Sequence, residues 1–483
     1  MRMSGLVEVA RTGDPSARLV GDATVDVDNV TLDSRAVSPG DLFACVRGEQ
    51  VDGHRFTGDA VAAGAVALMV DEEPLADSLA GGAAEVPRLV VADVRRSLGP
   101  VASAVHGDPS TRIDVIGVTG TNGKTTTTHM LADVLGTAGR SCVVIGTLSG
   151  LRTTPEAPEL QRRLAVAVDE GAATVAMEVS SHALSQHRVD GTRFRIAAFT
   201  NLGRDHLDYH ADMEDYFNAK ARLFTPALCD EAVVLVDGPW GRRLAEQATV
   251  PVTTCSLDDA VDLTVRADGS SFSWRGHPVT LGLPGVFNVA NAVVAATVAE
   301  RLGVETPVIA TGLGAVGQVA GRFERIDVGQ PFEVVVDFAH TPDALGAVLD
   351  AARGVSRSHR VLVVFGCGGE RDTAKRAEMG AVAAGNAEVV VVTADNSRSE
   401  ATSDIVAAIV DGVRGVAGGE SRLVVIDDRR EAMAAAFDAA HPGDVVVVAG
   451  RGHETELHLG DTRVPFDDRV VARHLLAERG WGA

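Results

Sequence analysis

Apolar and polar positions alternate along this chain in three successive blocks of strand-like and helix-like runs. In the first block, short apolar runs predict strands at residues 42–46, 65–70 and 89–94. In the second block, strands are expected at 113–116, 143–145, 174–179, 196–200 and 232–236. The third block, after residue 324, predicts strands at 333–336, 361–365, 389–393, 423–426 and 445–448, and helices at 373–384, 404–413 and 429–439.

This alternation is typical of α/β domains with mostly parallel, doubly wound sheets. With 483 residues, the chain exceeds one ordinary core, and a usual domain size of roughly 100–200 residues suggests about three domains. We therefore expect a smaller N-terminal α/β domain (residues 1–98), a central phosphate-loop domain (99–326) and a C-terminal Rossmann-like domain (327–483).

The segment GVTGTNGKTTTT, residues 117–128, joins a predicted strand to a predicted helix. Its glycines let the backbone wrap a phosphate, and the helix N-terminus adds positive potential. Lys124 offers a cation to the β- and γ-phosphates, and the Thr125 hydroxyl a ligand for Mg²⁺. The segment predicts a nucleoside triphosphate site rather than an ordinary glycine-rich turn. It departs from the general pattern, because Val118 stands where the first glycine is usual.

Polar clusters follow the predicted strands throughout the second and third blocks. They lie at residues 119–125, 178–182, 200–206, 337–340, 367–371, 395–398 and 450–454. Ligands in open α/β sheets bind beyond the carboxyl ends of the strands. Clusters from two domains therefore predict one site in the cleft between them.

Composition narrows the class of function. The net charge is −22, from 44 basic and 66 acidic residues. A protein with this much negative charge repels nucleic acid and anionic membranes. Five scattered cysteines without a C-x-x-C pair fit reduced thiols. No signal-like N-terminus and no run of 18 apolar residues occurs. We expect a cytoplasmic small-molecule enzyme with no nucleic-acid or membrane partner.

Single residues are ambiguous when they are considered alone. Glu178 at a strand end suits Mg²⁺, but it could equally cap the next helix. By itself, His206 would be a hydrogen-bonded loop histidine and Lys220 a surface lysine.

Seven motifs carry a family resemblance. In chain order they are TGTNGKT, MEVSSHALSQHRV, TNLGRDHLDYHADMEDYFNAK, DFAHTPDAL, FGCGGERD, DNSR and GRGHE, spread from residue 119 to 454. Together they resemble the Mur ligases. The N-terminal LDSR and GDLFACVRGEQVDGHRF are similar to the uridine-nucleotide domain of the same family. The resemblance covers nearly the whole chain. Within the family, the motifs are most similar to those of the members that add the third peptide residue, a diamino acid, to UDP-N-acetylmuramoyl-L-alanyl-D-glutamate.

The resemblance implies residues for ATP and magnesium. The ATP loop comprises Gly120, Thr121, Asn122, Gly123, Lys124, Thr125 and Thr126. Asn288, Arg322 and His340 belong to the nucleotide pocket, with Asn291 and Asp343 beside them. Two Mg²⁺ ions are implied, held by Thr125, Glu178, His206 and a carbamylated Lys220. Lys124, Glu178, His206 and Lys220 are thereby the expected catalytic residues.

The resemblance also implies three substrate regions. UDP is expected at Leu32, Ser34, Glu49, Gln50 and Val51. The muramoyl-dipeptide is expected at Thr153, Thr154, Ser180, Gln186 and Arg188. The diamino acid is expected at Arg371, Asp395, Asn396, Ser397, Arg398, Gly450 and Glu454.

Arg398 could hold the distal carboxylate of diaminopimelate, which lysine lacks, and so discriminate between the two amino acids. Without the resemblance, Thr153 and Thr154 would be interpreted as a helix N-terminus. Arg188, Arg371 and Arg398 would be interpreted as ordinary surface cations.

Four departures from the family pattern are visible. Ser397 stands where proline is usual, Arg451 where lysine is common and Phe338 where tyrosine is common. The segment at residues 150–152 is shorter than usual.

We therefore predict a monomeric ATP-dependent amide ligase that adds meso-2,6-diaminopimelate through an acyl phosphate. The base that deprotonates the amine stays open between His340 and Glu454. LL-diaminopimelate, L-lysine and a secondary-metabolite substrate are alternatives, as is a folylpolyglutamate-synthetase-like ligase. A nucleotide-regulated binding protein is the non-enzyme alternative.

Overall fold

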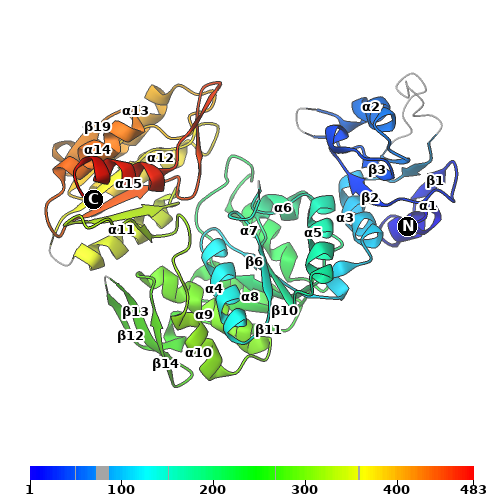
Figure 1. Ribbon diagram of the computed structural model, residues 1–483, viewed down its shortest axis with the longest axis horizontal. Coiled ribbons are helices and arrows are strands. Elements are labelled where there is room, and N and C mark those ends of the chain that lie inside the picture. The colour runs from blue at the N-terminus through cyan, green and yellow to red at the C-terminus, as the bar shows by residue number, and fades with distance from the viewer. Residues whose placement is uncertain (49–50, 72–85, 151, 267, 357–358, 483) are drawn as a thin grey trace.

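The computed structural model describes residues 1–48, 51–71, 86–150, 152–266, 268–356 and 359–482. The chain forms three α/β lobes, each built on its own sheet (Figure 1). The central lobe joins the other two. The predicted fold class is confirmed, while the boundaries after residues 98 and 326 stay predictions.

The N-terminal lobe contains a five-stranded sheet in the order β1-β5-β4-β3-β2, in which only β1 is antiparallel to its neighbour. Its strands are β1 (Arg18–Val20), β2 (Asn29–Thr31), β3 (Asp41–Ala44), β4 (Ala67–Val70) and β5 (Arg88–Val90), and its helices α1 (Met3–Gly13), α2 (Thr57–Ala62) and α3 (Val94–Val105). The strand predicted at 89–94 is too long, because the Asp93 side chain accepts a hydrogen bond from the Arg96 N–H and begins α3.

The central lobe contains a parallel six-stranded sheet in the order β11-β10-β9-β6-β8-β7. Its strands are β6 (Asp114–Thr119), β7 (Cys142–Ile145), β8 (Thr174–Glu178), β9 (Phe194–Phe199), β10 (Cys229–Leu235) and β11 (Val252–Cys255). Its helices are α4 (Lys124–Thr137), α5 (Ala157–Asp169), α6 (Ser181–Ser185), α7 (Met213–Ala221), α8 (Pro239–Gln247), α9 (Val286–Arg301) and α10 (Thr306–Gly314).

An antiparallel sheet of three strands in this lobe escaped the sequence prediction. It comprises β12 (Ala260–Arg266), β13 (Gly269–Trp274) and β14 (His277–Leu281). One of its faces packs into the same core as α4, α9 and α10. Helix α9 is therefore buried on nearly every side, which explains its alanine- and valine-rich sequence.

The C-terminal lobe contains a six-stranded sheet in the order β15-β16-β20-β17-β18-β19, parallel except for β15. Its strands are β15 (Glu324–Arg325), β16 (Glu333–Asp337), β17 (Val361–Phe365), β18 (Val389–Val392), β19 (Leu423–Val425) and β20 (Val445–Ala449). Two faces of this sheet are covered, which is why its central strands are almost continuous valine runs.

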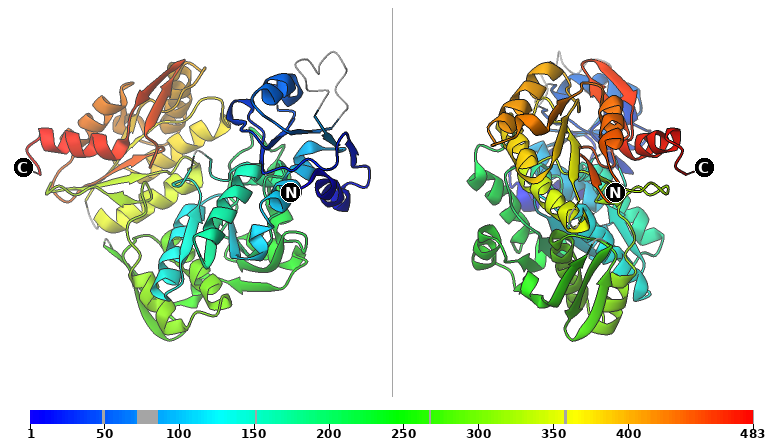
Figure 2. Two further views of the ribbon diagram at one scale, coloured as in Figure 1. Left: turned by 45° about the vertical axis from the view of Figure 1, so that its right-hand side comes forward. Right: turned by 90° about the vertical axis from the view of Figure 1, so that its left-hand side faces the viewer.

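The covering helices of this lobe are α11 (Pro342–Ser356), α12 (Ala374–Asn386), α13 (Thr402–Arg414), α14 (Arg429–Ala439) and α15 (Asp468–Glu478). A hairpin of β21 (Glu456–Leu459) and β22 (Thr462–Pro465) precedes α15. Figure 2 shows α11 on the side of the lobe that faces the central lobe. No helix within the described ranges is long and apolar enough to cross a membrane.

Candidate active site

A cavity of about 1020 Å³ lies between the central and C-terminal lobes. Its wall combines the phosphate loop, the ends of β8 and β9, and the loops after β16, β17, β18 and β20. The polar clusters that the sequence placed after strands therefore meet at one site, as the strand-end rule requires.

The phosphate loop connects β6 to α4 through a turn that only glycine tolerates. Gly120 and Gly123 have φ angles of +156° and +87°. A Cβ atom at Gly120 would lie 2.0 Å from the Thr200 hydroxyl, and one at Gly123 would lie 2.2 Å from the Asn291 amide oxygen. The loop is thereby held by close packing as well as by its own geometry.

The loop after β9 holds the phosphate loop in place through hydrogen bonds. Thr200 Oγ1 donates to the Asn122 carbonyl at 2.6 Å, and the Asn122 N–H donates to Asn201 Oδ1 at 2.9 Å. Lys124 Nζ bends back to the carbonyls of Gly120 and Thr121, at 2.7 and 2.9 Å. The lysine charge therefore sits over the turn where phosphate oxygens would lie.

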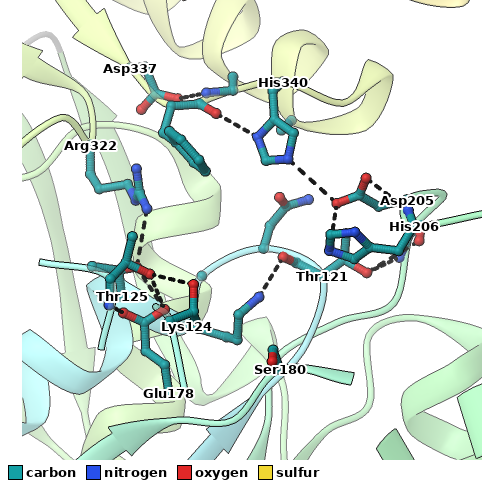
Figure 3. Close-up of a pocket in the computed structure, with 18 of the residues that line it drawn as sticks. Thr121, Lys124, Thr125, Glu178, Ser180, Asp205, His206, Arg322, Asp337 and His340 are labelled. Atoms are coloured by element: carbon teal, nitrogen blue, oxygen red, sulfur yellow. Dashed lines mark hydrogen bonds and ion pairs between the residues drawn. The ribbon is translucent and has the colours of Figure 1, made fainter. Parts of the chain in front are cut away.

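Glu178 ends β8 next to the first turn of α4. The Thr125 hydroxyl donates to its Oε2 at 3.0 Å, and the Thr147 N–H donates to its Oε1 at 2.8 Å. Arg322, in the segment that joins the two lobes, donates to the Thr125 hydroxyl at 3.2 Å (Figure 3). A hydroxyl, a carboxylate and a guanidinium thus converge beside the phosphate loop.

His206 lies at the cavity wall with a φ of +57°. Burial lowers its pKa to about 2, although Asp205 opposes the shift. Its ring is neutral at ordinary pH, and a neutral imidazole can act as a metal ligand.

Lys220 lies beneath the phosphate loop with 1% of its surface exposed. Its Nζ donates to the Gly120 carbonyl at 3.0 Å and lies 4.6 Å from the centre of the Tyr216 ring. Burial, together with the nearby charge of Lys124, lowers its pKa well below the usual value. The side chain is therefore a buried amine and not an exposed ammonium.

The donor set is compatible with Mg²⁺ without forming a closed cage. Thr125 and Glu178 supply oxygen atoms 3.0 Å apart, which suit a hard cation. Within the described ranges, no three His, Cys, Asp or Glu side chains cluster as a metal site. The remaining ligands would come from phosphates and water, as is usual for Mg²⁺.

Asp205 links the two lobes and was not singled out from the sequence. It is 4% exposed, and its carboxylate lies 3.5 Å from His340 Nε2 and 3.8 Å from Lys375 Nζ. Burial raises its pKa, but the hydrogen bond and charge of His340 and the charges of His206 and Lys375 outweigh that effect, so the pKa is well below its ordinary value. The sequence signal was only the polar cluster after β9.

The two candidates for the base differ in their surroundings. His340 Nδ1 lies 2.9 Å from the Phe338 carbonyl, and Nε2 faces Asp205. Both ring nitrogens of His340 therefore face acceptor oxygens. Burial, and then the negative charge of Asp395, raise the pKa of Glu454, with Arg451 opposing. The raised pKa makes Glu454 a stronger base than an ordinary carboxylate.

The residues predicted for the diamino acid gather on the C-terminal side of the cavity. Arg371, Asp395, Asn396, Arg398, Gly450 and Glu454 all line it. Arg398 has a φ of +50°, and its NH1 donates to the Gly369 carbonyl at 2.5 Å. Ser397 is 2% exposed and lies behind this wall, not on it.

The residues predicted for the muramoyl-dipeptide lie on the central-lobe side of the cavity. Thr153, Thr154, Ser180 and Arg188 line the cavity. Arg188 donates to Gln186 Oε1 at 2.6 Å and pairs with Glu156 at 3.1 Å. Gln186 is not among the lining residues, so its place is to orient Arg188.

Some predicted residues lie away from the cavity wall. Asn288 is 2% exposed and donates to the Pro284 carbonyl at 2.8 Å, while Asn291, one turn later in α9, lines the cavity. Leu32, Ser34 and Val51 lie in the N-terminal lobe, and Val51 is 49% exposed. Glu49 and Gln50 lie outside the described residues.

Lys375, Asn201 and Thr147 also line the cavity but were missed by the sequence reasoning. Lys375 lies in the first turn of α12, where a lysine carries no distinguishing signal. Thr147 follows β7, and only its position after a strand could have pointed to it.

Comparison with known proteins identifies the family. Residues 118–299 match the Mur ligase middle domain, 321–452 the Mur ligase glutamate ligase domain and 26–106 the Mur ligase family catalytic domain. A Streptomyces coelicolor protein named UDP-N-acetylmuramoyl-L-alanyl-D-glutamate--2,6-diaminopimelate ligase is 42% identical over 97% of this chain and 96% of its own. The chain belongs to the Mur ligase family. The resemblance drawn from the seven motifs is thereby confirmed.

Other Mur ligases extend this match. A Corynebacterium efficiens protein of the same name is 44% identical over 98% of this chain and 94% of its own. A solved structure of an enzyme with that name is 33% identical, covers 94% of this chain and 95% of its own, and has a TM-score of 0.64. The MurF ligase of Thermotoga maritima in complex with ADP is 19% identical, covers 94% of this chain and 96% of its own, and has a TM-score of 0.65, which shows the shared fold. As a Mur ligase, this chain is an ATP-dependent enzyme that forms an amide bond.

Proposed function

We propose that this enzyme joins 2,6-diaminopimelate to UDP-N-acetylmuramoyl-L-alanyl-D-glutamate, with the meso isomer as its substrate, in the synthesis of peptidoglycan precursors. One observation carries the proposal: a single cavity has a phosphate loop on one wall and Arg371, Arg398 and Glu454 on the other. A diamino acid with a carboxylate and an ammonium at each end needs such a combination of guanidinium and carboxylate groups.

The residues would act in two steps. In the first, Lys124 and Arg322 hold the ATP phosphates while Arg188 and Thr154 orient the dipeptide, whose γ-carboxylate attacks the γ-phosphorus and displaces ADP. In the second, the amine of the diamino acid attacks the acyl phosphate carbonyl, loses a proton, and phosphate leaves. Contact between the lobes would exclude water, which would otherwise hydrolyse the acyl phosphate.

We infer that two Mg²⁺ ions take part, with Thr125, Glu178 and His206 as ligands of the first and a carbamylated Lys220 toward the second. Bound Mg²⁺ would neutralise charge on the transferring phosphoryl group. The support is the oxygen pair of Thr125 and Glu178, the neutral ring of His206, and the buried amine of Lys220, whose pKa is well below its usual value. Only a neutral amine reacts with CO₂ to form a carbamate.

The uridine-binding role of Leu32, Ser34 and the segment at residues 49–51 stays part of the proposal, as does a monomer acting in the cytoplasm. All five cysteines lie in the described ranges and are free thiols, which suits a reducing compartment.

Purified protein tests this function directly. It would be incubated with ATP, Mg²⁺ and UDP-N-acetylmuramoyl-L-alanyl-D-glutamate, and with meso-diaminopimelate, LL-diaminopimelate or L-lysine in separate reactions. We expect phosphate release that requires both substrates and is fastest with the meso isomer. Oxygen-18 in the γ-carboxylate should appear in the released phosphate. No release with any amino acid, or release only with a folate and glutamate, would contradict the proposal.

A further inference from the structure

Arg451 is a fully buried guanidinium behind the amino-acid wall of the cavity. It is 0% exposed and follows β20 by two residues. Its NH1 donates to Asn396 Oδ1 at 3.0 Å, and its NH2 donates to the carbonyls of Glu456 and Phe466 at 2.6 and 3.1 Å. One side chain therefore joins the loop after β18 to β21 and to the residue that follows β22.

Three carboxylates from three segments surround the same guanidinium. Its nitrogens lie 3.4 Å from Glu454, 3.7 Å from Asp395 and 3.9 Å from Asp468. Asp395 is 7% exposed and Asp468 is 0% exposed. Asp468 is also paired with the buried Arg429 at 2.7 Å, so Arg451 and Arg429 together supply the positive charge that lets these carboxylates lie close to one another.

The contacts of Arg451 also determine the orientation of the Asn396 amide. Asn396 Oδ1 accepts from Arg451 and from the His458 N–H at 2.8 Å, which occupies both of its lone pairs. The amide nitrogen therefore points the other way, and it donates to Glu454 Oε2 at 2.8 Å. Glu454 is held by the amide of Asn396 and by Arg451 at once.

We propose that Arg451 is a positioning residue that sets Asp395, Asn396 and Glu454 in the arrangement that receives the ammonium groups of the diamino acid. This inference rests on the proposed function. Arg451 does not line the cavity, so it acts through these three residues and not on the substrate. A lysine could reach one of its acceptors but lacks the planar fork that reaches the amide oxygen and two carbonyls together.

The charge of Arg451 also acts on the protonation of Glu454. Burial and Asp395 raise the pKa of Glu454, and Arg451, Asn396 and His340 lower it. Arg322, Arg398 and Arg429 also face this carboxylate and interact with its charge. Loss of the Arg451 cation should raise the pKa of Glu454 further. More of this carboxyl would then be protonated at a given pH, and an ammonium would lose its counter-charge.

Steady-state kinetics of the full-length enzyme test the proposal, with Arg451→Lys and Arg451→Met compared with Arg360→Lys. Arg360 has a similar set of partners, the Asp444 carboxylate at 2.6 Å and the Ala439 carbonyl at 2.7 Å, but lies at the start of β17, outside the cavity wall. It is therefore a matched control. Thermal unfolding of each variant shows whether it folds. If Arg451→Met does not fold, the kinetics of Arg451→Lys alone test the proposal.

For Arg451→Lys we expect the KM for the diamino acid to rise about 10-fold, as for one lost buried hydrogen bond, while the KM for ATP stays within about twofold. The acid limb of kcat/KM for the diamino acid should move to higher pH, and Arg360→Lys should change neither quantity. An unchanged KM for the diamino acid, or an equal rise for all substrates, overturns the positioning role. If the unmutated enzyme releases no phosphate with any diamino acid, the proposed function fails as well. An active enzyme with an unaffected variant overturns this inference alone.

Discussion

At the scale of single residues, burial decides which charge states the site can use. Lys220 and His206 are the clearest cases, since burial lowers the pKa of both. In the sequence they resembled a surface lysine and a loop histidine, and only their surroundings in the fold distinguish them. The neutral forms of these two side chains are the forms that can be carbamylated or bind a metal.

Lys220→Ala should lower kcat by about 10²–10³, the usual effect of removing one electrostatic group from a phosphoryl- or acyl-transfer site. A short carboxylic acid such as acetate, added at high concentration, should restore part of the rate by occupying the place of the carbamate. Lys124→Ala is the control, because the loss of the phosphate-loop cation cannot be repaired by an anion. Equal responses of the two variants to acetate would argue against carbamylation.

Arg398→Ala should raise the KM for diaminopimelate about 10- to 100-fold, because hydrogen bonds to charged groups contribute about 1.5–3 kcal/mol. The KM for ATP should not change, since Arg398 lies on the opposite wall from the phosphate loop. Discrimination against L-lysine should fall at the same time. Arg414→Ala, which removes an exposed guanidinium outside the cavity wall, provides the comparison. A loss of ATP affinity as large as that for the amino acid would contradict the assigned role.

At the scale of elements, the turn between β6 and α4 determines where the nucleotide can bind. The sequence predicted this strand, turn and helix from local pattern alone, because the apolar run, the glycines and the helical spacing lie within about two dozen residues of each other. The tight packing of the turn against Thr200 and Asn291 could not be predicted, since those residues are distant in sequence.

Gly120→Ala should weaken ATP binding severely and lower the free energy of unfolding by about 1–3 kcal/mol. The added Cβ would meet the Thr200 hydroxyl, and the backbone conformation disfavours any L side chain. Gly136→Ala is the matched control in α4, because nothing lies within 4 Å of the added atom. It should stabilise the helix by about 0.5–1 kcal/mol. Chemical denaturation and nucleotide titration of both variants measure these effects, and similar behaviour of the two would refute the account of the turn.

At the scale of the whole molecule, charged side chains of the loop after β9 form ion pairs with α12 and with the segment that precedes it. Arg204 lies 2.6 Å from Glu378 and 3.4 Å from Asp372, and Asp208 lies 3.5 Å from Arg371. With the contacts of Asp205, these pairs hold the C-terminal lobe against the central lobe. Each lobe contributes both positive and negative side chains to these pairs. If one lobe moved along the other, like charges would face each other and repel, so the pairs favour one relative position of the lobes.

Arg204→Glu should favour separation of the lobes and raise the KM for ATP and for the diamino acid together, because each substrate contacts one side of the cavity. The effect should be moderate, about 0.2–1 kcal/mol for each exposed pair, and should weaken at high salt. Small-angle X-ray scattering would report a larger radius of gyration. The double variant Arg204→Glu with Glu378→Arg should regain part of the closure, and its failure to do so would show that this pair does not hold the lobes together.

Much of the architecture could be predicted because parallel strands buried on both faces leave long apolar runs, as β17 and β20 do. The β12–β14 sheet could not, since its alternation is weak and much of β12 is exposed. Residues of the site that follow strands were found from the strand-end rule and the family motifs. Lys375 and Arg451 were not assigned a role, because their contacts involve residues from other elements.

The amino-acid sequence by itself therefore determined the three α/β units, the phosphate loop and the family, since these depend on short-range patterns and ordered motifs. Only the tertiary structure decided which strand ends share one cavity, which side chains line it, and which lie behind it. It also decided the direction in which the pKa values of Lys220, His206 and Glu454 shift. Burial and electrostatic interaction depend on distances between atoms in space, and the order of residues along the chain does not contain those distances.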